Sequence, residues 1–373
     1  YEIISLNFST YGATLVFLDE KGKRCAPVYN YLKPLEKEIK EKFLERYNKE
    51  GDFFRRTAST DLDLLNSGLQ IFRLKELKPE QFKKVKHILH LPNYISYLFT
   101  GQFTSEYTSI GCHTALWDYD RFAYDNWLSK EGIELPLPDA NHTLCDISFE
   151  GKKLKAGIGI HDSSASLVPY LKSGEEFILL STGTWCINMN PYNNEPLTKE
   201  ELQKDCLCYL STRQKQVKSY RFFMGHIHDH YLEIMNSHFN LHPDAYKIVK
   251  PDFIKHSEWK NENRRMFDAG LKEVDLRLFT SFDEAYNRLV FDLTVLEIES
   301  LKLVIPGNDS SGNIYITGGF SNNSIFTSLI ANAFPSKNVF ISEIKNSSAL
   351  GAAMAVGPSL ENFDAGMRRI NNV

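Results

Sequence analysis

The sequence has little of what marks several classes of protein. It holds 21 glycines and 14 prolines among 373 residues, too few for a fibrous or low-complexity chain. The formal net charge of −4 provides no basic field that would hold a nucleic-acid backbone. The longest apolar run, Ala349 to Gly357, is far shorter than the roughly 20 residues that a membrane-spanning helix needs. These absences predict a folded protein whose partners include neither nucleic acid nor membrane.

Cysteine is also scarce. The six cysteines are scattered, and their spacing does not resemble the disulfide framework of a small secreted protein. Cys206 and Cys208 would point to opposite faces of a strand, which argues against a mutual disulfide and against a shared metal. We therefore expect a reducing, cytoplasmic setting.

The length predicts about two domains, at roughly 150 residues per domain. A short polar stretch around Gly174 is the expected boundary, which gives domains of residues 1–174 and 175–373. Hydrophobic periodicity predicts helices over residues 34–50, 78–100, 121–131 and 281–304, and a strand, turn and strand over residues 177–190. Residues 198–260 show no clear pattern.

One carboxylate stands where a strand gives way to a helix. Residues 155–161 have the composition of a buried strand, and the small residues after Asp162 open an apolar helix. Backbone N–H groups and the positive end of a helix favour an ionised carboxylate, so Asp162 could act as a base. A simple helix cap is the alternative, because aspartate is among the best capping residues.

Two glycine motifs have the composition of phosphate-binding loops. The first is a turn between two strands, and the second follows a strand and leads into a helix; the residues are Gly183 and Thr184, and Gly318, Gly319, Ser321 and Asn322. Backbone amides in such turns can approach phosphate oxygens closely. An ordinary hairpin turn and an ordinary strand exit are the alternatives.

The order of these motifs resembles the FGGY family of carbohydrate kinases, most closely its rhamnulokinase and L-fuculokinase branch. The stretch from Leu91 to Gly101, followed by Glu106 and Thr108, is similar to a long family segment and is the most specific part of the likeness. The resemblance implies an α/β, two-domain fold of the actin and hexokinase (ribonuclease H-like) type with an interdomain cleft. It also implies that the N-terminal domain binds the sugar and the C-terminal domain binds the nucleotide.

The resemblance further implies the roles of individual residues. Asp162 would take the proton of a sugar hydroxyl, and the sugar would be bound by Thr10, Tyr11, Gly12 and His161. Gly183 and Thr184 would hold the transferred phosphate, and Gly318, Gly319, Ser321 and Asn322 would lie on the adenosine side. The implied reaction is the ATP- and Mg²⁺-dependent phosphorylation of a ketose such as L-fuculose or L-rhamnulose, and a homodimer is left open.

Two departures from the family favour an alternative. In the family a phosphate- and Mg²⁺-binding turn lies on the first hairpin, and Tyr1 is expected to begin after that unit, so the N-terminal domain would be incomplete. The family's Arg-Asp pair has no clear counterpart in residues 27–32. The alternative is a sugar sensor that keeps the kinase fold but has weak catalysis or none.

The histidine-rich segment around His228 supplies a hypothesis from another enzyme class. His226 and His230 are four residues apart and would share a helix face, which suits a hydrolytic metal site. The segment offers neither a glutamate base nor a clear third ligand, so surface or core histidines are the simpler interpretation.

Overall fold

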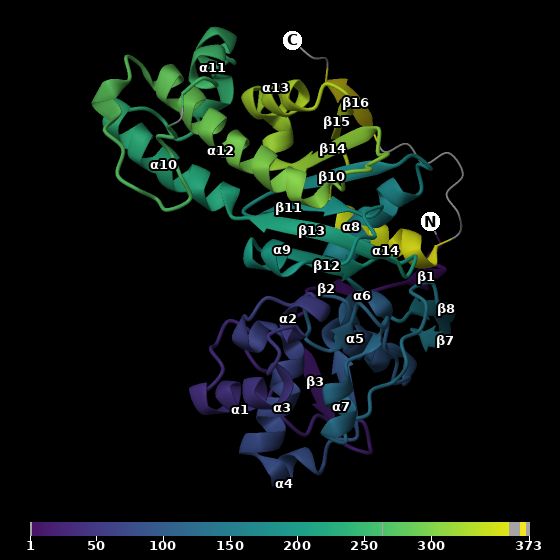
Figure 1. Ribbon diagram of the computed structural model, residues 1–373. Coiled ribbons are helices and arrows are strands. Elements are labelled where there is room, and N and C mark those ends of the chain that lie inside the picture. The colour runs from purple at the N-terminus through teal and green to yellow at the C-terminus, as the bar shows by residue number, and fades with distance from the viewer. Residues whose placement is uncertain (1, 263, 358–365, 371–373) are drawn as a thin grey trace. The chain divides into compact units, whose positions relative to one another are not determined.

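The computed structural model describes residues 2–262, 264–357 and 366–370. The chain forms two compact units, and each mixes helices with strands (Figure 1). Unit 1 comprises Tyr1–Gly174, Asn194–Lys218 and Asn346–Phe363; unit 2 comprises Glu175–Asn193, Ser219–Lys345 and Asp364–Val373. The chain thus leaves unit 1 after Gly174 and returns to it twice. The sugar-binding and nucleotide-binding roles expected of the two domains remain predictions.

Unit 1 contains small sheets, which pair as β1–β8–β7, β2–β9, β3–β4 and β5–β6. The β1–β8 and β2–β9 pairs are parallel and the others are antiparallel. The strands are β1 (Ser5–Leu6), β2 (Ser9–Thr10), β3 (Leu15–Leu18), β4 (His87–His90), β5 (Trp117–Asp118), β6 (Ala123–Tyr124), β7 (Leu144–Phe149), β8 (Lys152–Gly157), β9 (Ile160–His161) and β12 (Cys206–Leu210).

The helices of unit 1 surround an aromatic core. Phe43 lies at its centre, with ring centroids 5.1 Å from Phe53, 5.1 Å from Phe72 and 5.4 Å from Trp127. The helices are α1 (Lys37–Tyr47), α2 (Phe53–Arg56), α3 (Ser67–Leu77), α4 (Pro79–Phe82), α5 (Leu91–Thr100), α6 (Tyr107–Ile110), α7 (Asn126–Lys130), α8 (Asp162–Leu171), α9 (Lys199–Gln203) and α14 (Ser347–Val356), with a 3₁₀ turn at Asp63–Leu65. The amphipathic helix predicted over residues 34–50 is confirmed as α1.

Two helix predictions in unit 1 are partly wrong. Within residues 78–100, the segment His87–His90 is strand β4, because its backbone pairs with β3 and the long-range ladder outweighs the helical pattern. Within residues 121–131, Ala123 and Tyr124 pair with β5, and only Asn126–Lys130 is helical. That helix begins where the side chain of Asp125 accepts the N–H of Trp127.

Helices α8 and α14 approach each other closely in unit 1. A Cβ atom added to Gly351 would lie 1.8 Å from the carbonyl oxygen of Ala165, so only glycine allows this approach. The Asn7 side chain donates to the Ala352 carbonyl (2.9 Å) and accepts from Gly159 N–H (3.1 Å). The strands before α8 and the small-residue helix α14 therefore fix the start of α8.

Unit 2 is built on the sheet order β11–β10–β14–β15–β16 (Figure 1). Strands β10, β14 and β15 are parallel, and β11 and β16 run antiparallel to their neighbours. Helix α12 packs against β11, and α13 packs against β15 and β16. The elements are β10 (Phe177–Thr182), β11 (Cys186–Asn190), β13 (Gln216–Phe222, which begins in unit 1), β14 (Asn313–Gly318), β15 (Asn338–Ser342), β16 (Met367–Ile370), α10 (Met224–Phe239), α11 (Phe253–Trp259), α12 (Phe282–Val304) and α13 (Ser324–Ala333), with 3₁₀ turns at Ala245–Ile248, Leu276–Leu278 and Gly319–Asn322.

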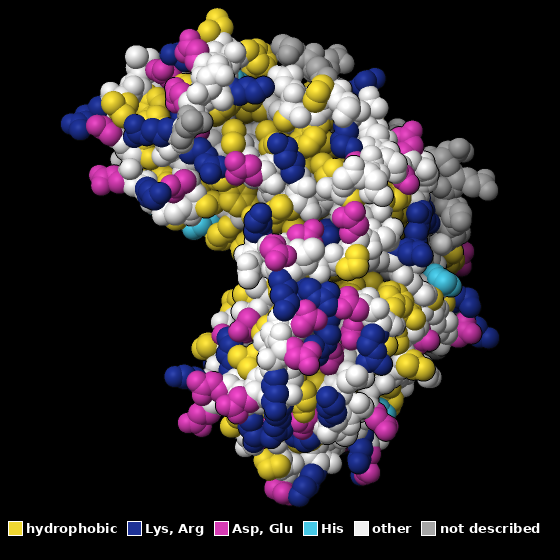
Figure 2. Space-filling view, viewed as in Figure 1, with side chains coloured by type: hydrophobic (Ala, Val, Ile, Leu, Met, Phe, Trp, Pro, Cys, Tyr) yellow, Lys and Arg dark blue, Asp and Glu magenta, His cyan; other side chains and the backbone are white. Residues whose placement is uncertain are grey.

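The surface carries charges of both signs (Figure 2), and the described cysteines form no disulfides. Basic and acidic side chains are interspersed over the face that Figure 2 shows. The six cysteines all lie among the described residues and form no disulfide, and Cys206 and Cys208 are buried in β12. Over the described ranges, every helix is too short or too polar to span a lipid bilayer.

Candidate functional site

In unit 1, two segments far apart in the sequence meet at the β2–β9 pair. Thr10 is the register partner of His161, and the parallel pairing places the residues after Thr10 beside the start of α8. A Cβ atom on Gly12 would lie 3.0 Å from the Cys112 side chain and 3.1 Å from the His161 ring. Tyr11 is 44% exposed, and its ring lies 5.3 Å from that of Tyr31. The predicted sugar-binding residues are therefore neighbours within one unit.

Asp162 is the first residue of α8 and keeps its side chain 43% exposed. Its Oδ1 accepts the backbone N–H of Ser163 (2.6 Å) and lies 3.1 Å from Nε2 of His161. His161, not Asp162, occupies the N-cap position, and its side chain makes no capping hydrogen bond. The carboxylate thus sits at the positive end of a ten-residue helix and keeps an accessible face, so both the base and the capping interpretations stay open.

His161 is buried next to this exposed carboxylate. Its Nε2 lies 3.0 Å from Cys112 Sγ, and its Nδ1 lies 3.3 Å from Ser164 Oγ. Burial lowers the pKa of His161, whereas the nearby carboxylates of Asp162 and Glu106 partly oppose that shift. A neutral imidazole therefore stands beside Asp162 at neutral pH.

A buried carboxylate organises the backbone behind His161. Glu106 caps α6 and accepts the N–H groups of Thr108 (2.6 Å) and Ser109 (2.8 Å). It also accepts the Thr108 hydroxyl and the side-chain amide of Asn141, both at 2.6 Å. Thr108 Oγ1 in turn accepts the N–H of His161 at 3.0 Å. Glu106 and Thr108, which the family resemblance singled out, thus fix the backbone just before Asp162.

In unit 2, the turn between β10 and β11 packs against the start of α10. The N–H of Gly183 donates to the Trp185 carbonyl, and the Thr184 carbonyl accepts the N–H of Gly225, both at 3.1 Å. A Cβ atom on Gly225 would lie 2.2 Å from the Gly183 carbonyl oxygen. Gly225 is therefore required for the close approach of α10 to this turn.

The second glycine motif lies next to the first. Gly318 ends β14 with φ +86°, and a Cβ atom there would lie 1.7 Å from the Thr182 carbonyl oxygen. The Thr182 hydroxyl donates to the Thr317 carbonyl (2.6 Å) and accepts the N–H of Phe320 (3.0 Å). Both motifs thus stand at the carboxyl ends of the parallel strands β10 and β14, the edge where open α/β sheets bind ligands.

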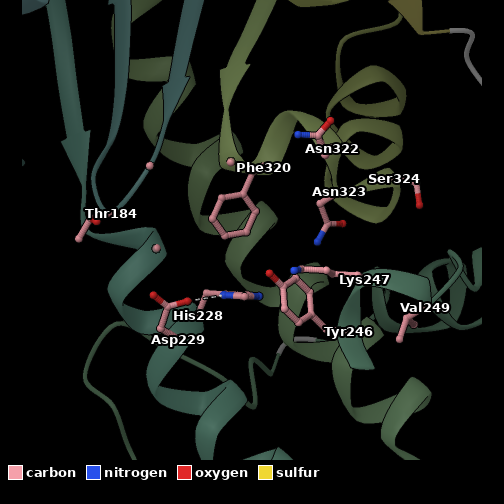
Figure 3. Close-up of a pocket in the computed structure, with 13 residues that line it drawn as sticks. Thr184, His228, Asp229, Tyr246, Lys247, Val249, Phe320, Asn322, Asn323 and Ser324 are labelled. Carbon is pink, nitrogen blue, oxygen red and sulfur yellow. Dashed lines mark hydrogen bonds and ion pairs between the residues drawn. The ribbon is translucent and has the colours of Figure 1, made fainter. Parts of the chain in front are cut away.

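A cavity of about 460 Å³ opens at this edge, within the size range of small-molecule sites (Figure 3). Its lining includes four of the predicted nucleotide-side residues: Gly183, Thr184, Gly319 and Asn322. Gly318 and Ser321 do not line it; Ser321 Oγ donates to the Gly318 carbonyl (2.6 Å) and so closes the turn. The lining residues that the sequence did not assign to the nucleotide side are Gly225, His228, Asp229, Tyr246, Lys247, Val249, Phe320, Asn323 and Ser324.

A hydrogen-bonded chain orders one wall of this cavity. Asn323 Nδ2 donates to the Tyr286 hydroxyl (2.8 Å), which lies 3.1 Å from Nε2 of His228. Nδ1 of His228 lies 3.0 Å from Asp229 Oδ1, and a dashed line marks this contact in Figure 3. This hydrogen bond to His228 holds the pKa of Asp229 below its usual value. The cavity therefore carries an ionised carboxylate in a fixed place.

The histidine-rich segment does not assemble the predicted hydrolytic site. His226 stacks on Phe223 with ring centroids 4.5 Å apart, and only His228 of the three histidines lines the cavity. No group of three or more His, Cys, Asp or Glu that could hold a metal ion occurs in the described part of the chain. Mg²⁺ needs no such cage, because it is usually held by one or two carboxylates and substrate phosphates. Asp229 is a carboxylate of this kind.

Comparison with known proteins relates one part of the chain to a family. Residues 1–134 match the N-terminal domain of the FGGY family of carbohydrate kinases. This part of the chain is an FGGY domain. The predicted relation to the FGGY family is thereby confirmed, and the match includes Thr10, Tyr11, Gly12 and Glu106.

The named proteins that the chain resembles are kinases, and all of them are distant from it. A rhamnulokinase from Halalkalibacterium halodurans is 25% identical over 198 residues, which cover 50% of this chain and 41% of that protein. A carbohydrate kinase from Novosphingobium aromaticivorans has 20% identity and a TM-score of 0.81, over 100% of this chain and 83% of that one. A Plasmodium falciparum glycerol kinase solved with ADP has 14% identity and a TM-score of 0.70, over 95% of this chain and 74% of that one.

These likenesses confirm the expected fold class, the two-domain actin- and hexokinase-like fold of FGGY sugar kinases. The chain matches less than half the length of the first rhamnulokinases, at 41% and 42%. The substrate and the activity of this chain are therefore matters of proposal.

Proposed function

We propose that this protein is an ATP-dependent sugar kinase, which transfers the γ-phosphoryl group to a hydroxyl of a ketose. The observation that carries the proposal is the meeting of Thr10–Gly12 with His161 and Asp162 at the β2–β9 pair. It sets an accessible carboxylate, at a helix N-terminus, beside a turn whose backbone and exposed tyrosine offer polar and aromatic contacts. The FGGY match over residues 1–134 supports the same conclusion.

In this proposal Asp162 is the general base. Phosphoryl transfer depends mainly on positioning and on neutralising charge, and in a loose transition state the hydroxyl proton leaves late. The main task of Asp162 is then to orient the hydroxyl, and a strong base is unnecessary. Thr10, Tyr11, Gly12 and His161 bind the sugar.

The cavity of unit 2 is the proposed nucleotide site. Gly183 and Thr184 would meet the phosphates, and Gly319 and Asn322 the adenosine side. Gly318 and Ser321 would shape that turn through the close approach and hydrogen bond described above. The rings of Phe320 and Tyr246 offer apolar faces against which a base can pack (Figure 3). Mg²⁺ would arrive with ATP and neutralise phosphate charge.

The proposed sugar is L-rhamnulose or L-fuculose. The rhamnulokinase relatives support a deoxy-ketose, but at about 25% identity they support it only by analogy. The L-fuculokinase likeness, a cytoplasmic location and a homodimer stay predictions from the sequence.

The test is ADP release from the purified protein with ATP, Mg²⁺ and a panel of ketoses, aldoses and polyols. We expect saturable release with one ketose, and Asp162→Asn should lower kcat by roughly 10²- to 10⁴-fold, the usual contribution of general acid–base catalysis. Asp146→Asn is the matched control, because Asp146 is exposed in β7 and pairs with Lys155 at the surface.

Near-normal turnover of Asp162→Asn would remove this residue from the mechanism. A folded protein that binds ATP and one sugar, yet releases no sugar-dependent ADP, would favour the sensor alternative instead.

A further inference from the structure

Ser164 contacts one of the two ring nitrogens of His161. Its side chain is buried, and its hydroxyl donates to the carbonyl oxygen of Leu210 at 2.9 Å. A serine hydroxyl has one proton, so the same Oγ can only accept from Nδ1 of His161, which lies 3.3 Å away. This contact favours the neutral imidazole with its proton on Nδ1.

The other nitrogen then faces Asp162 with a lone pair. Nε2 lies 3.0 Å from Cys112 Sγ, whose thiol can donate, and 3.1 Å from Asp162 Oδ1. An ionised carboxylate has no proton to give to this nitrogen. Once Asp162 has taken up a proton, however, its hydroxyl oxygen and Nε2 form a donor and acceptor pair.

We propose that Ser164 holds His161 as the Nδ1–H tautomer and that Nε2 receives the proton which Asp162 takes from the sugar hydroxyl. The proposal rests on the kinase function above. The hydroxyl O–H bond breaks as a carboxyl O–H bond forms, and the oxygen electron pair bonds to the γ-phosphorus while ADP leaves. The carboxyl proton then moves to Nε2, which restores the carboxylate and leaves an imidazolium. Ser164 is a positioning residue in this scheme.

Other groups around the imidazole bear on its protonation. Asp162 faces it from α8, Cys112 from the segment after α6, and Tyr209 from β12 with ring centroids 5.5 Å apart. The charge of Glu106 also acts on this region, whereas His90 in β4 is neutral there because burial lowers its pKa to about 3. Burial opposes a lasting imidazolium, so the proton leaves again through the half-exposed Asp162 carboxylate.

Nitrogen NMR on the resting protein tests the tautomer without any substrate. In ¹⁵N-histidine-labelled protein, with His161 assigned from a His161→Gln spectrum, we expect a protonated Nδ1 and an unprotonated Nε2. Ser164→Ala should move the proton to Nε2, where it can donate to Asp162. Ser173→Ala, whose hydroxyl donates to the Tyr170 carbonyl near the end of α8, should change nothing. An Nε2–H tautomer in the unsubstituted protein would overturn the proposal, even if Ser164→Ala fails to fold.

Steady-state kinetics tests the proton transfer. Ser164→Ala should lower kcat about tenfold with a nearly unchanged sugar KM, because the acceptor lone pair is lost while binding is kept. When kcat is plotted against pH, the acidic limb should move to lower pH, because a proton on Nε2 would donate to the Asp162 carboxylate and favour its ionised form. Ser164→Thr keeps the hydroxyl and should restore both kcat and the position of the acidic limb.

A lower kcat with an unmoved acidic limb would indicate a merely structural role and overturn the transfer step. If the protein has no kinase activity, the proposed function and the transfer step fail together, whereas the NMR spectrum still decides the tautomer.

Discussion

The two candidate groups of residues are held in place by different means. Around Asp162 in unit 1, a buried carboxylate, Glu106, satisfies four hydrogen-bond donors and fixes the backbone before His161. Around the cavity in unit 2, glycines at positions 225 and 318 allow backbone to approach backbone. Side-chain charge thus organises the first group and close backbone packing organises the second.

Buried glutamates sharpen this comparison. Glu297 in α12 is as buried as Glu106, but its Oε1 has no hydrogen-bond partner within the described residues, and Ser300 Oγ lies 3.4 Å from Oε2. Burial raises the pKa of Glu297 to about 7. The same substitution should therefore have opposite effects on stability at the two positions.

Glu106→Gln should have the largest effect. The NH2 group of the new glutamine would face groups that themselves donate hydrogen bonds at this fully buried site. The hydrogen bonds that remain would lose the assistance of the negative charge. The free energy of unfolding should therefore fall by about 4 kcal/mol. Chemical denaturation measures this change. Sugar-dependent kcat should fall as well, because Glu106 supports the backbone of His161 through Thr108. Unchanged stability would show that this network does not organise unit 1.

Glu297→Gln should raise stability at pH 8 by about 3 kcal/mol, because the pKa of this carboxyl is about 7 in the folded state and ordinary in the unfolded state. The folded state binds the proton more tightly, so the stability contributed by Glu297 is full below about pH 4.5 and is lost as the pH rises to 7. The variant should lack this loss. Denaturation midpoints of both proteins from pH 5 to pH 8 measure the difference, and parallel curves would contradict the prediction.

The sequence predicted the unit 1 group better than the cavity. Asp162, His161 and the Thr10–Gly12 turn lie in short segments whose strand and helix patterns are clear. Tyr246, Lys247 and Val249 come from residues 198–260, where no periodicity is visible, and only tertiary packing brings them to the cavity. Asn323 carried a readable signal, since an asparagine before an apolar helix is typical of an N-cap, which it is.

The fold was predictable mainly where local pattern and long-range pairing agree. Helix α12 and the β10–β11 hairpin follow their patterns. Strand β4 does not, because its conformation is set by pairing with β3, about 70 residues earlier in the chain. The return of Asn194–Lys218 and Asn346–Phe363 to unit 1 is likewise a matter of tertiary packing, which leaves no mark on local composition.

Gly225→Ala tests the close packing in unit 2. The added methyl group would lie 2.2 Å from the Gly183 carbonyl oxygen and should displace the Gly183–Thr184 turn. We expect the KM for ATP to rise by about tenfold or more, some 1.4 kcal/mol, with the sugar KM unchanged. Gly312→Ala is the matched control, because a Cβ atom there meets nothing within 4 Å. A rise in the sugar KM alone would contradict the division of roles between the two groups.

Tyr11→Ala should have the smallest effect of these four substitutions, and the effect should be on sugar binding. Tyr11 is 44% exposed and contacts Tyr31 through its ring, so its removal should cost little stability. Loss of its contact with the sugar should raise the sugar KM severalfold to about tenfold. The kcat and the KM for ATP should stay near their original values, because the contact stabilises the bound sugar and the transition state equally. Steady-state kinetics with the preferred ketose measures this split. Tyr31→Phe keeps the aromatic pair and serves as the control, and an unchanged sugar KM in Tyr11→Ala would remove Tyr11 from the sugar site.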